Sequence, residues 1–289
     1  MRARTKRTRV SRPVVVAVTS DQHCGSTVAL CPERIALDDG GEYVASTAQC
    51  WLWANWLDFW GKADALRTAH DAALYTVFNG DLTEGSHHHS TQVLSGNPAA
   101  QAAVVNAAMA PVLALRPDRM FFVRGTEAHV GPSACHEERI AVGLTKDGRP
   151  VEGDPTSGTA SWWHLRMAVH GHRLDFAHHG RMGQRPWTKH TGVGSLAAQI
   201  FYEHAAREEA YPQLAIRSHY HRHADSGSLH PTRVVQTPAW QLHTAFVHKV
   251  APDSLADIGG LLILLAPDRP PDVAAILYRA DPAPVWRLR

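Results

Sequence analysis

The sequence has few cysteines and no long apolar run. None of its four cysteines forms a Cys-x-x-Cys pair, so neither a disulfide framework nor a thiolate zinc site is indicated, and reduced thiols are expected. No apolar run approaches the length that spans a bilayer, and the short N-terminal apolar stretch runs into Asp21 without a small-residue cleavage site. We therefore expect a cytoplasmic protein with no membrane partner.

Lysine is scarce as well, since only 5 of the 29 basic residues are lysine. Six basic residues and no acidic ones fall within residues 1–12, so the formal net charge of +2 leaves −4 for the rest of the chain. We expect residues 1–12 to form a disordered basic arm, either solvated or in contact with nucleic acid. The net negative charge of the remainder argues against a dedicated duplex-binding protein.

The apolar runs of the first half predict a parallel β-sheet. They indicate strands at 14–19, 73–78 and 120–123, with helices between them at 42–71 and 98–115. Strands that are joined by helical crossovers normally lie parallel in one sheet. The carboxyl ends of these strands are therefore expected to meet at one edge.

The second half has a different pattern. Alternating residues around Gly171 predict a hairpin, and a helix is expected over 194–210. Short apolar runs predict an antiparallel sheet from 213–217, 233–237, 260–266 and 273–278. We expect an α/β fold class with two packed sheets and helices outside, in a single domain over 13–289 with a loop insertion at 144–160.

Five acidic or histidine-bearing segments carry the chemistry, and an apolar run precedes each of the first four. They are Asp21-Gln22-His23, Gly80-Asp81, Gly125-Thr126-Glu127-Ala128-His129, His178-His179-Gly180 and Ser218-His219-Tyr220-His221. Ligands of an open α/β sheet gather beyond the carboxyl ends of the strands, so these segments can converge. Carboxylates and neutral imidazoles suit Mn, Fe, Ni or Zn better than Ca or Mg. Together the segments indicate a two-metal phosphoesterase centre.

In their order these segments resemble the motifs of calcineurin-like metallophosphoesterases. That family carries D-x-H, G-D, G-N-H-(D/E), H-G and G-H-x-H, and the resemblance runs from Val14 to about His221. It implies two packed mixed β-sheets flanked by helices, and two divalent cations, for which manganese is favoured. The implied ligands are Asp21, His23 and His221 for the first metal, Asp81 as the bridge, and His179 and His219 for the second metal.

His179 is preferred to His178 as the ligand because Gly180 follows it, as in the H-G motif. A second H-G sequence, His170-Gly171, lies at the expected hairpin turn and is interpreted as unrelated to the site.

The third segment departs from the family pattern, because Gly125-Thr126-Glu127-Ala128-His129 stands where Gly-Asn-His is expected. We predict that Glu127 replaces the asparagine ligand of the second metal and that His129 protonates the leaving group. The alternative is that Glu127 lies outside the coordination sphere and His129 is the ligand.

Three further residues are expected to contact phosphoryl oxygens, and they are His88, Arg124 and Arg181. A solvated loop for His88 and ordinary surface charge for the arginines are the alternatives.

The function expected from these features is dinuclear metal-dependent hydrolysis of phosphate esters by a metal-activated hydroxide. A phosphodiesterase or nuclease is favoured, with nucleic acid as one candidate substrate, and a phosphomonoesterase is the alternative within the class. The altered third segment supports another hypothesis, a metal-binding scaffold without turnover. No serine or cysteine nucleophile motif is present, so no covalent intermediate is implied. The oligomeric state is not indicated.

Overall fold

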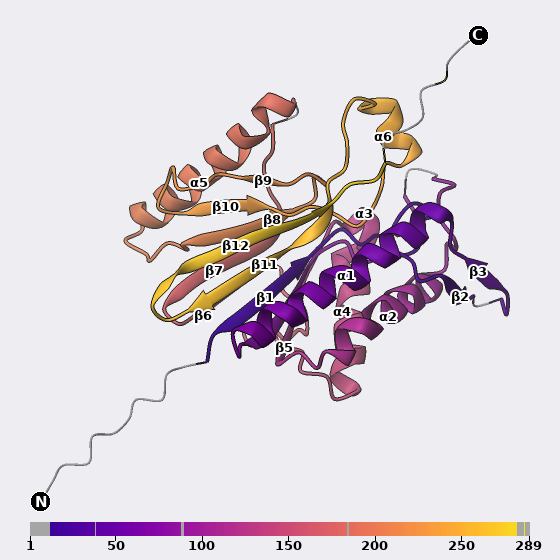
Figure 1. Ribbon diagram of the computed structural model, residues 1–289, viewed down its shortest axis with the longest axis horizontal. Coiled ribbons are helices and arrows are strands. Elements are labelled where there is room, and N and C mark those ends of the chain that lie inside the picture. Colours follow the sequence, from indigo (N-terminus) through magenta and orange to yellow (C-terminus); the bar gives the residue numbers. More distant parts are fainter. Residues whose placement is uncertain (1–11, 38, 88–89, 184, 282–285, 287–289) are drawn as a thin grey trace, which may run out of the picture.

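The computed structural model describes residues 12–37, 39–87, 90–183, 185–281 and 286 (Figure 1). Within them, two five-stranded β-sheets pack against each other and helices cover their outer sides (Figure 1). Each sheet contains both parallel and antiparallel neighbours. The expected fold class of two packed mixed sheets flanked by helices is therefore confirmed. The expected basic arm at 1–12 lies outside the described residues except for Arg12.

The first sheet has the strand order β12-β11-β1-β4-β5. Its centre is the predicted parallel set, in which β1 pairs with β4 and β4 pairs with β5. Two antiparallel strands, β11 and β12, extend it beyond β1. The bounds are Val14–Thr19 for β1, Ala73–Asn79 for β4, Arg119–Val123 for β5, Ile258–Ala266 for β11 and Arg269–Tyr278 for β12.

The second sheet has the order β6-β7-β8-β10-β9. The hairpin expected around Gly171 is present as β6 and β7, whereas β8 lies parallel to both of its neighbours, β7 and β10. The bounds are Leu165–Val169 for β6, His172–His179 for β7, Leu214–Ser218 for β8, Ala224–Asp225 for β9 and Arg233–Gln236 for β10. A separate two-stranded ribbon consists of β2 (Arg34–Ala36) and β3 (Glu42–Val44).

Helices α1, α2 and α4 lie on the first sheet's side of the molecule, and α5 covers the second sheet (Figure 1). Short helices α3 and α6 stand near the end where the two sheets converge (Figure 1). The helices are α1 (Thr47–Ala69), α2 (Pro98–Ala114), α3 (Glu127–Val130), α4 (Cys135–Lys146), α5 (Lys189–Ala206) and α6 (Ala245–Val250), with 3-10 turns at Pro132–Ala134 and Pro186–Thr188.

The central strand β1 is buried on both faces, as its unbroken apolar run predicts. Val14, Val16 and Val18 contribute to the core between the sheets, while Val15 and Ala17 face the core beneath the helices. The tryptophans of α1 belong to this second core, where Trp56 and Trp60 pack edge to face at 5.4 Å. The aromatic residues of α1 therefore serve helix-to-sheet packing.

Two expectations about these elements were wrong. The helix expected from residue 42 begins at Thr47, because Ser46 and Gln49 form a capping box there and residues 42–44 pair in β3. The late strands do not form one antiparallel sheet, since β11 and β12 join the first sheet. Of the expected insertion at 144–160, the first three residues end α4, and the stretch then passes β5, where Val151 bridges Met120.

No helix in the described parts of the chain is both long and apolar enough to cross a membrane.

The buried tryptophan of α1 gives a test of this packing. Trp56 is fully buried and its Nε1 donates to Ala108 O on α2 at 2.9 Å. We expect Trp56→Ala to lower the free energy of unfolding by about 3–5 kcal/mol, through the cavity and the lost hydrogen bond. The neighbouring Leu57→Ala, at an exposed position, should change it by about 0.5 kcal/mol or less. Urea unfolding of both variants measures the difference, and equal effects would contradict the assignment.

Candidate metal centre

The predicted segments meet where the carboxyl ends of β1, β4, β5, β7 and β8 converge. Backbone hydrogen bonds join them, because Asp21 N donates to Gly80 O at 2.9 Å and His23 N donates to Asp81 O at 3.0 Å. Five expected ligands have left-handed φ angles, namely Asp21 (53°), His23 (45°), Asp81 (56°), His219 (80°) and His221 (54°). Such strained conformations persist where the surrounding structure holds them, and they concentrate at functional sites.

Two glycines are required by the close approach of these loops. A Cβ on Gly80 would lie 2.3 Å from His178 Nδ1, and one on Gly125 would lie 2.2 Å from Asp81 Oδ1. The glycines of the second and third segments therefore let the loops pack directly against the site residues.

The first group of donor atoms consists of Asp21, His23 and His221. The Nε2 atoms of the two histidines lie 3.1 Å apart, and His221 Nε2 is 3.3 Å from Asp21 Oδ1. Asp21 Oδ1 is buried and has no hydrogen-bond partner among the described residues. Burial alone would raise the pKa of Asp21, but the neighbouring His221 and His178 lower it by more. The pKa of this carboxyl is therefore well below its usual value. An ionised carboxylate that keeps one oxygen without a hydrogen bond, beside two imidazoles, is suited to a cation.

The second group centres on Asp81 and His178. His178 Nδ1 lies 2.8 Å from Asn79 O and donates to it, which leaves Nε2 pointing to Asp81 Oδ2 at 3.0 Å and Asp21 Oδ1 at 3.9 Å. Although close to both carboxylates, this Nε2 is buried without hydrogen-bond geometry to any described residue. A histidine that donates one ring N–H to a backbone carbonyl and leaves the other nitrogen free has the posture of a metal ligand.

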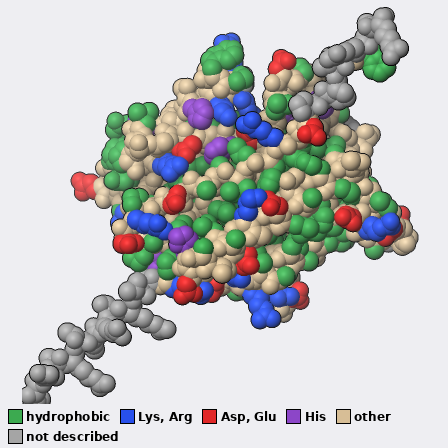
Figure 2. Space-filling view, in the orientation of Figure 1, with side chains coloured by type: hydrophobic (Ala, Val, Ile, Leu, Met, Phe, Trp, Pro, Cys, Tyr) green, Lys and Arg blue, Asp and Glu red, His purple; other side chains and the backbone are tan. Residues whose placement is uncertain are grey.

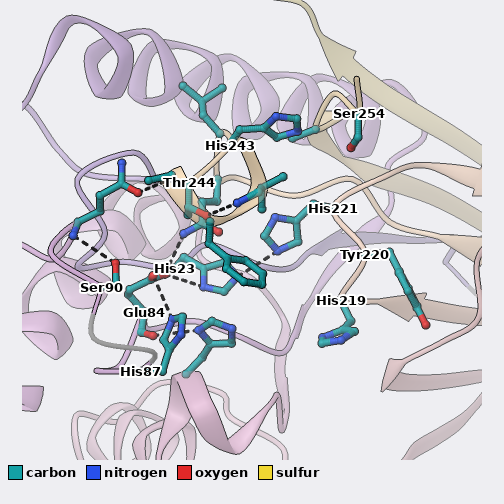
Figure 3. Close-up of a pocket in the computed structure, with 18 of the residues that line it drawn as sticks. His23, Glu84, His87, Ser90, His219, Tyr220, His221, His243, Thr244 and Ser254 are labelled. Carbon is teal, nitrogen blue, oxygen red and sulfur yellow. Dashed lines mark hydrogen bonds and ion pairs between the residues drawn. The ribbon is translucent and has the colours of Figure 1, made fainter. Parts of the chain in front are cut away.

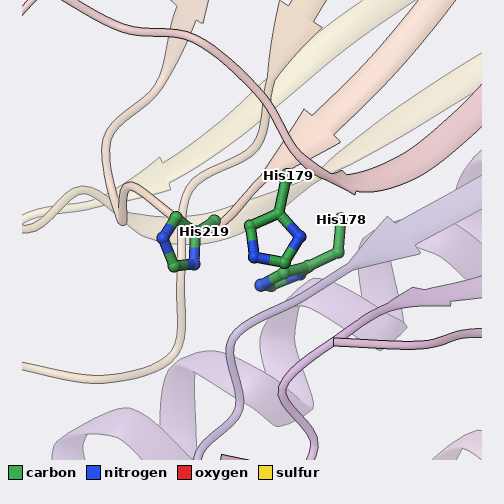
Figure 4. A group of neighbouring side chains, drawn as sticks. All are labelled: His178, His179 and His219. Carbon is green, nitrogen blue, oxygen red and sulfur yellow. The ribbon is translucent and has the colours of Figure 1, made fainter. Parts of the chain in front are cut away.

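His179 and His219 lie beside His178, as Figure 4 shows. Their ring centroids are 4.7 Å apart, and Thr126 Oγ1 lies 3.3 Å from His179 Nε2 and 3.2 Å from His219 Nδ1. Burial, with His178 nearby, lowers the pKa of His219 to about 4 and that of His179 below its usual range. Both rings are therefore neutral at pH 7, which is the form that binds metals.

The charge balance of the site also favours cations. Burial lowers the pKa of His178, but Asp81 and Asp21 raise it more, to about 10. A pKa raised to this extent indicates that the negative charges of Asp81 and Asp21 are concentrated around the ring. Metal binding displaces protons from such ligands, so a divalent cation can supply the same positive charge.

Glu84 is a buried carboxylate that the sequence motifs did not indicate. Its Oε2 lies 3.0 Å from His23 Nδ1 and accepts from Gln241 Nε2 at 2.8 Å, while its Oε1 lies 3.2 Å from His87 Nε2. Because Glu84 faces Nδ1, the His23 ring presents Nε2 to Asp21 and His221. A carboxylate behind a metal-ligating histidine fixes the ring and raises its basicity. The available signal was its position, three residues after Asp81 in the same loop.

Glu137 is a second buried acid that sequence reasoning missed. Its Oε2 accepts from Gly125 N at 2.6 Å, and its Oε1 lies 3.4 Å from Leu82 N. Burial and the nearby Asp81 raise the pKa of Glu137 to about 8. This side chain ties the second segment to the third, and its place on α4 gave no motif to detect.

The residues of the third segment lie in different parts of the structure. His129 lies beside His23, with ring centroids 4.4 Å apart, and its Nδ1 donates to Glu84 O at 2.9 Å. Glu127 is exposed, accepts from Ser133 N at 3.1 Å and lies in none of the donor groups found among the described residues. Thr126, which follows Gly125 directly, is the residue that reaches His179 and His219.

The two arginines expected to contact phosphate lie in different surroundings. Arg124 donates to Ser161 Oγ at 2.8 Å and stacks over the Trp163 ring at 4.9 Å. Arg181 lines a small, shallow pocket with Tyr220. His88 lies outside the described residues.

A cavity of about 540 Å³ opens beside the first group (Figure 3). His23, Glu84, His129 and His221 line its inner end, and the segment 242–247 lines another part. The site is therefore accessible from solvent on the side of the first group.

The motif order, the two mixed sheets and the grouped His and Asp donors now coincide at one edge of the molecule. The chain has the fold that its resemblance to calcineurin-like metallophosphoesterases implies, with two packed mixed β-sheets flanked by helices. Its His and Asp clusters are consistent with a site for two metals.

Comparisons with known proteins add only distant likenesses. No protein-family model matches the sequence, and no curated protein matches it. Among solved structures, Vps29 from Chaetomium thermophilum is 10% identical with a TM-score of 0.42, covering 93% of this chain and 97% of that one. The hypothetical protein PH1004 from Pyrococcus horikoshii OT3 is 10% identical with a TM-score of 0.43, covering 92% and 89%. A dimetal phosphatase from Danio rerio is 10% identical with a TM-score of 0.42, covering 89% and 96%. At such identities and scores, nothing about activity follows.

Glu84 provides a test of the site. We expect Glu84→Gln to weaken Mn²⁺ binding by roughly 10–100-fold, because the charged partner of His23 is lost while the side-chain shape is kept. Titration calorimetry of the metal-free protein measures this, with the exposed Glu203→Gln on α5 as the unaffected control. Weaker binding in Glu127→Gln, beside unchanged binding in Glu84→Gln, would instead favour Glu127 as the ligand.

Proposed function

We propose that this chain is a dinuclear metal-dependent hydrolase of phosphate esters, with phosphodiesters as the favoured substrates and manganese as the favoured metal. The observation that carries the proposal is a pair of buried atoms, Asp21 Oδ1 and His178 Nε2, which have no hydrogen-bond partner among the described residues and lie within one cluster of His and Asp donors. Buried polar atoms without partners are rare unless a ligand or ion completes them.

The donor groups suggest which residues hold each cation. Asp21, His23 and His221 would hold the first, and Asp81 would bridge, as the family resemblance implies. His179 and His219 would hold the second, and the position of His178 Nε2 adds this histidine to the proposed set. When bound, two cations polarise a phosphoryl group and lower the pKa of a water molecule.

Two residues of the site, Glu84 and Thr126, orient the side chains that would hold the cations. Glu84 keeps the His23 ring turned toward Asp21, and Thr126 N donates to Asp81 Oδ1 at 2.6 Å, which fixes that carboxylate. Each interaction preorganises a side chain before substrate arrives, which lowers the reorganisation needed for reaction.

His129 has two proposed roles, and the structure gives an observation for each. As a proton donor to the leaving group it is well placed, because it lines the cavity and its Nδ1 is held by Glu84 O. As a ligand it is suitably neutral, because burial and the neighbouring His23 lower its pKa to about 4. It also forms a donor group with His23 and Glu84.

A metal-binding scaffold without turnover is the second candidate function. The observation in its favour is the third segment, where Thr126 occupies the position next to Gly125 and Glu127 is turned away to Ser133. Such a protein would bind two cations and release no product.

The main test combines metal content with turnover. We expect purified protein to bind two Mn²⁺ and to hydrolyse bis-p-nitrophenyl phosphate, with the rate abolished by chelator and restored by Mn²⁺. Asp81→Asn should lose at least one cation. Its rate of hydrolysis should fall by at least the roughly 10–100-fold that is typical when an outer partner of a metal ligand is replaced. Full activity with two cations in Asp81→Asn would exclude the bridge, and two cations without turnover in the unmodified protein would favour the scaffold.

His129→Ala separates the two roles of that histidine. If His129 donates a proton, the variant should keep both cations and lose about 10²–10⁴-fold in rate on an alkyl ester, whose leaving group needs protonation. The loss should be much smaller on a nitrophenyl ester, whose leaving group departs as a stable anion. Steady-state kinetics on the two esters and mass-spectrometric metal analysis give the answer, and a metal-depleted variant would show that His129 is a ligand.

A further inference from the structure

The cavity beside the first donor group has one wall that the metal chemistry does not use. This wall is formed by the segment 242–256, which includes α6 and connects toward β11. Its cavity-lining apolar residues are Leu242, Ala245, Phe246, Val247, Leu255 and Ala256. Figure 2 shows the surface hollowed between α6 and the end of α5. A binding pocket for a small molecule is mostly apolar, with a few polar groups that fix orientation.

The segment is held in place by specific hydrogen bonds. Thr244 caps α6 by accepting from Val247 N, and Ala245 N donates to Gln92 Oε1 at 2.6 Å. Gln92 also lines the cavity, from the loop that follows β4. The wall is therefore attached to the far side of the cavity.

Two of the wall residues expose much of their side chains. Phe246 is 60% exposed and Leu255 is 79% exposed, although large apolar side chains normally avoid water. Tyr220, which lies between the two histidines of the last segment, adds a third partly exposed side chain to the lining. Exposed apolar side chains that gather around a cavity mark a binding surface.

The charge of the lining bears on which substrate fits. Apart from histidines, the charged side chains that line the cavity among the described residues are Arg222 and Glu84, and Glu84 already contacts His23 and Gln241. A nucleic-acid strand is bound by several cations that neutralise successive phosphates. One arginine in a cavity of about 540 Å³ does not provide such a track, whereas the volume suits one small molecule.

We propose that the segment 242–256 selects the substrate by receiving a neutral, ring-bearing organic group of nucleoside size, carried by a small phosphodiester. This inference rests on the proposed function, because the phosphoryl group is placed at the donor groups while the organic group lies against α6. It separates a small-molecule phosphodiesterase from a nuclease that acts on strands.

Two probes with the same leaving group test the inference. The p-nitrophenyl ester of thymidine 5′-monophosphate and methyl p-nitrophenyl phosphate each carry one negative charge and release nitrophenolate, and they differ in the retained group. In the manganese-loaded protein we expect kcat/KM to be at least about tenfold higher for the thymidine ester, since an apolar pocket distinguishes groups to this extent. The double variant Phe246→Ala/Leu255→Ser should bring the ratio of the two values close to one, with methyl-ester hydrolysis unchanged.

Leu229→Ala is the matched control, because Leu229 is 76% exposed and lies outside the cavity lining. Metal content and melting temperature are measured for each variant, and single Leu255→Ala provides a milder second variant. Release of nitrophenolate from neither ester would refute the proposed function itself. Equal kcat/KM for the two esters, or a ratio unchanged in the double variant, would overturn this inference alone. Faster cleavage of a single-stranded thymidylate oligonucleotide than of the thymidine ester would show that the cleft serves strands.

Discussion

The rest of the structure depends on two buried carboxylates that face the same site and whose charges must be balanced. Asp21 and Asp81 are almost fully buried at the ends of neighbouring parallel strands, and both raise the pKa of the nearby His178. Buried charges of one sign are tolerated only when opposite charge is close. His178 reaches both carboxylates from the second sheet, and Asn79 Nδ2 donates to Ala177 O and Ser218 Oγ, at 3.1 and 2.6 Å. The contacts that hold the two sheets together at this end of the molecule are therefore also contacts that balance the charge of the site.

This arrangement requires strained backbone conformations at several site residues. Left-handed φ angles at Asp21, His23 and Asp81 turn the side chains into the site immediately after their strands end. Each such residue is strained by roughly 1–3 kcal/mol, which the long buried strands and the ladder between β1 and β4 can offset. A candidate metal site at such an edge depends on the rigid, fully buried strand that precedes it. The unbroken run at Val14–Thr19 is thus connected with the chemistry as well as with the core.

The parts that could be predicted from the sequence are those with a local signature. Largely apolar runs locate β1 and β4, and the polar residues soon after them fall at the strand ends, so Asp21, His23 and Asp81 lie close together. Glu84 and Glu137 could not be recognised, because an acid in a loop or on a helix looks the same in sequence whether it is buried or solvated. Strand partners were also hidden: periodicity shows that a run is a strand, but not that β11 would pair with β1.

The site is asymmetric, and the asymmetry has consequences for function. On the first side, His23 is backed by a buried glutamate and the cavity opens directly beside it. On the second side, a threonine hydroxyl lies between His179 and His219, where the resembling family places an amide. A threonine side chain is shorter than an asparagine side chain, and its hydroxyl is a weaker metal ligand than an amide carbonyl, so a cation on that side would be held mainly by the histidines and Asp81. Under the proposed function, selectivity toward the organic part of a substrate would arise on the first side, where the cavity of about 540 Å³ is lined by the segment 242–256.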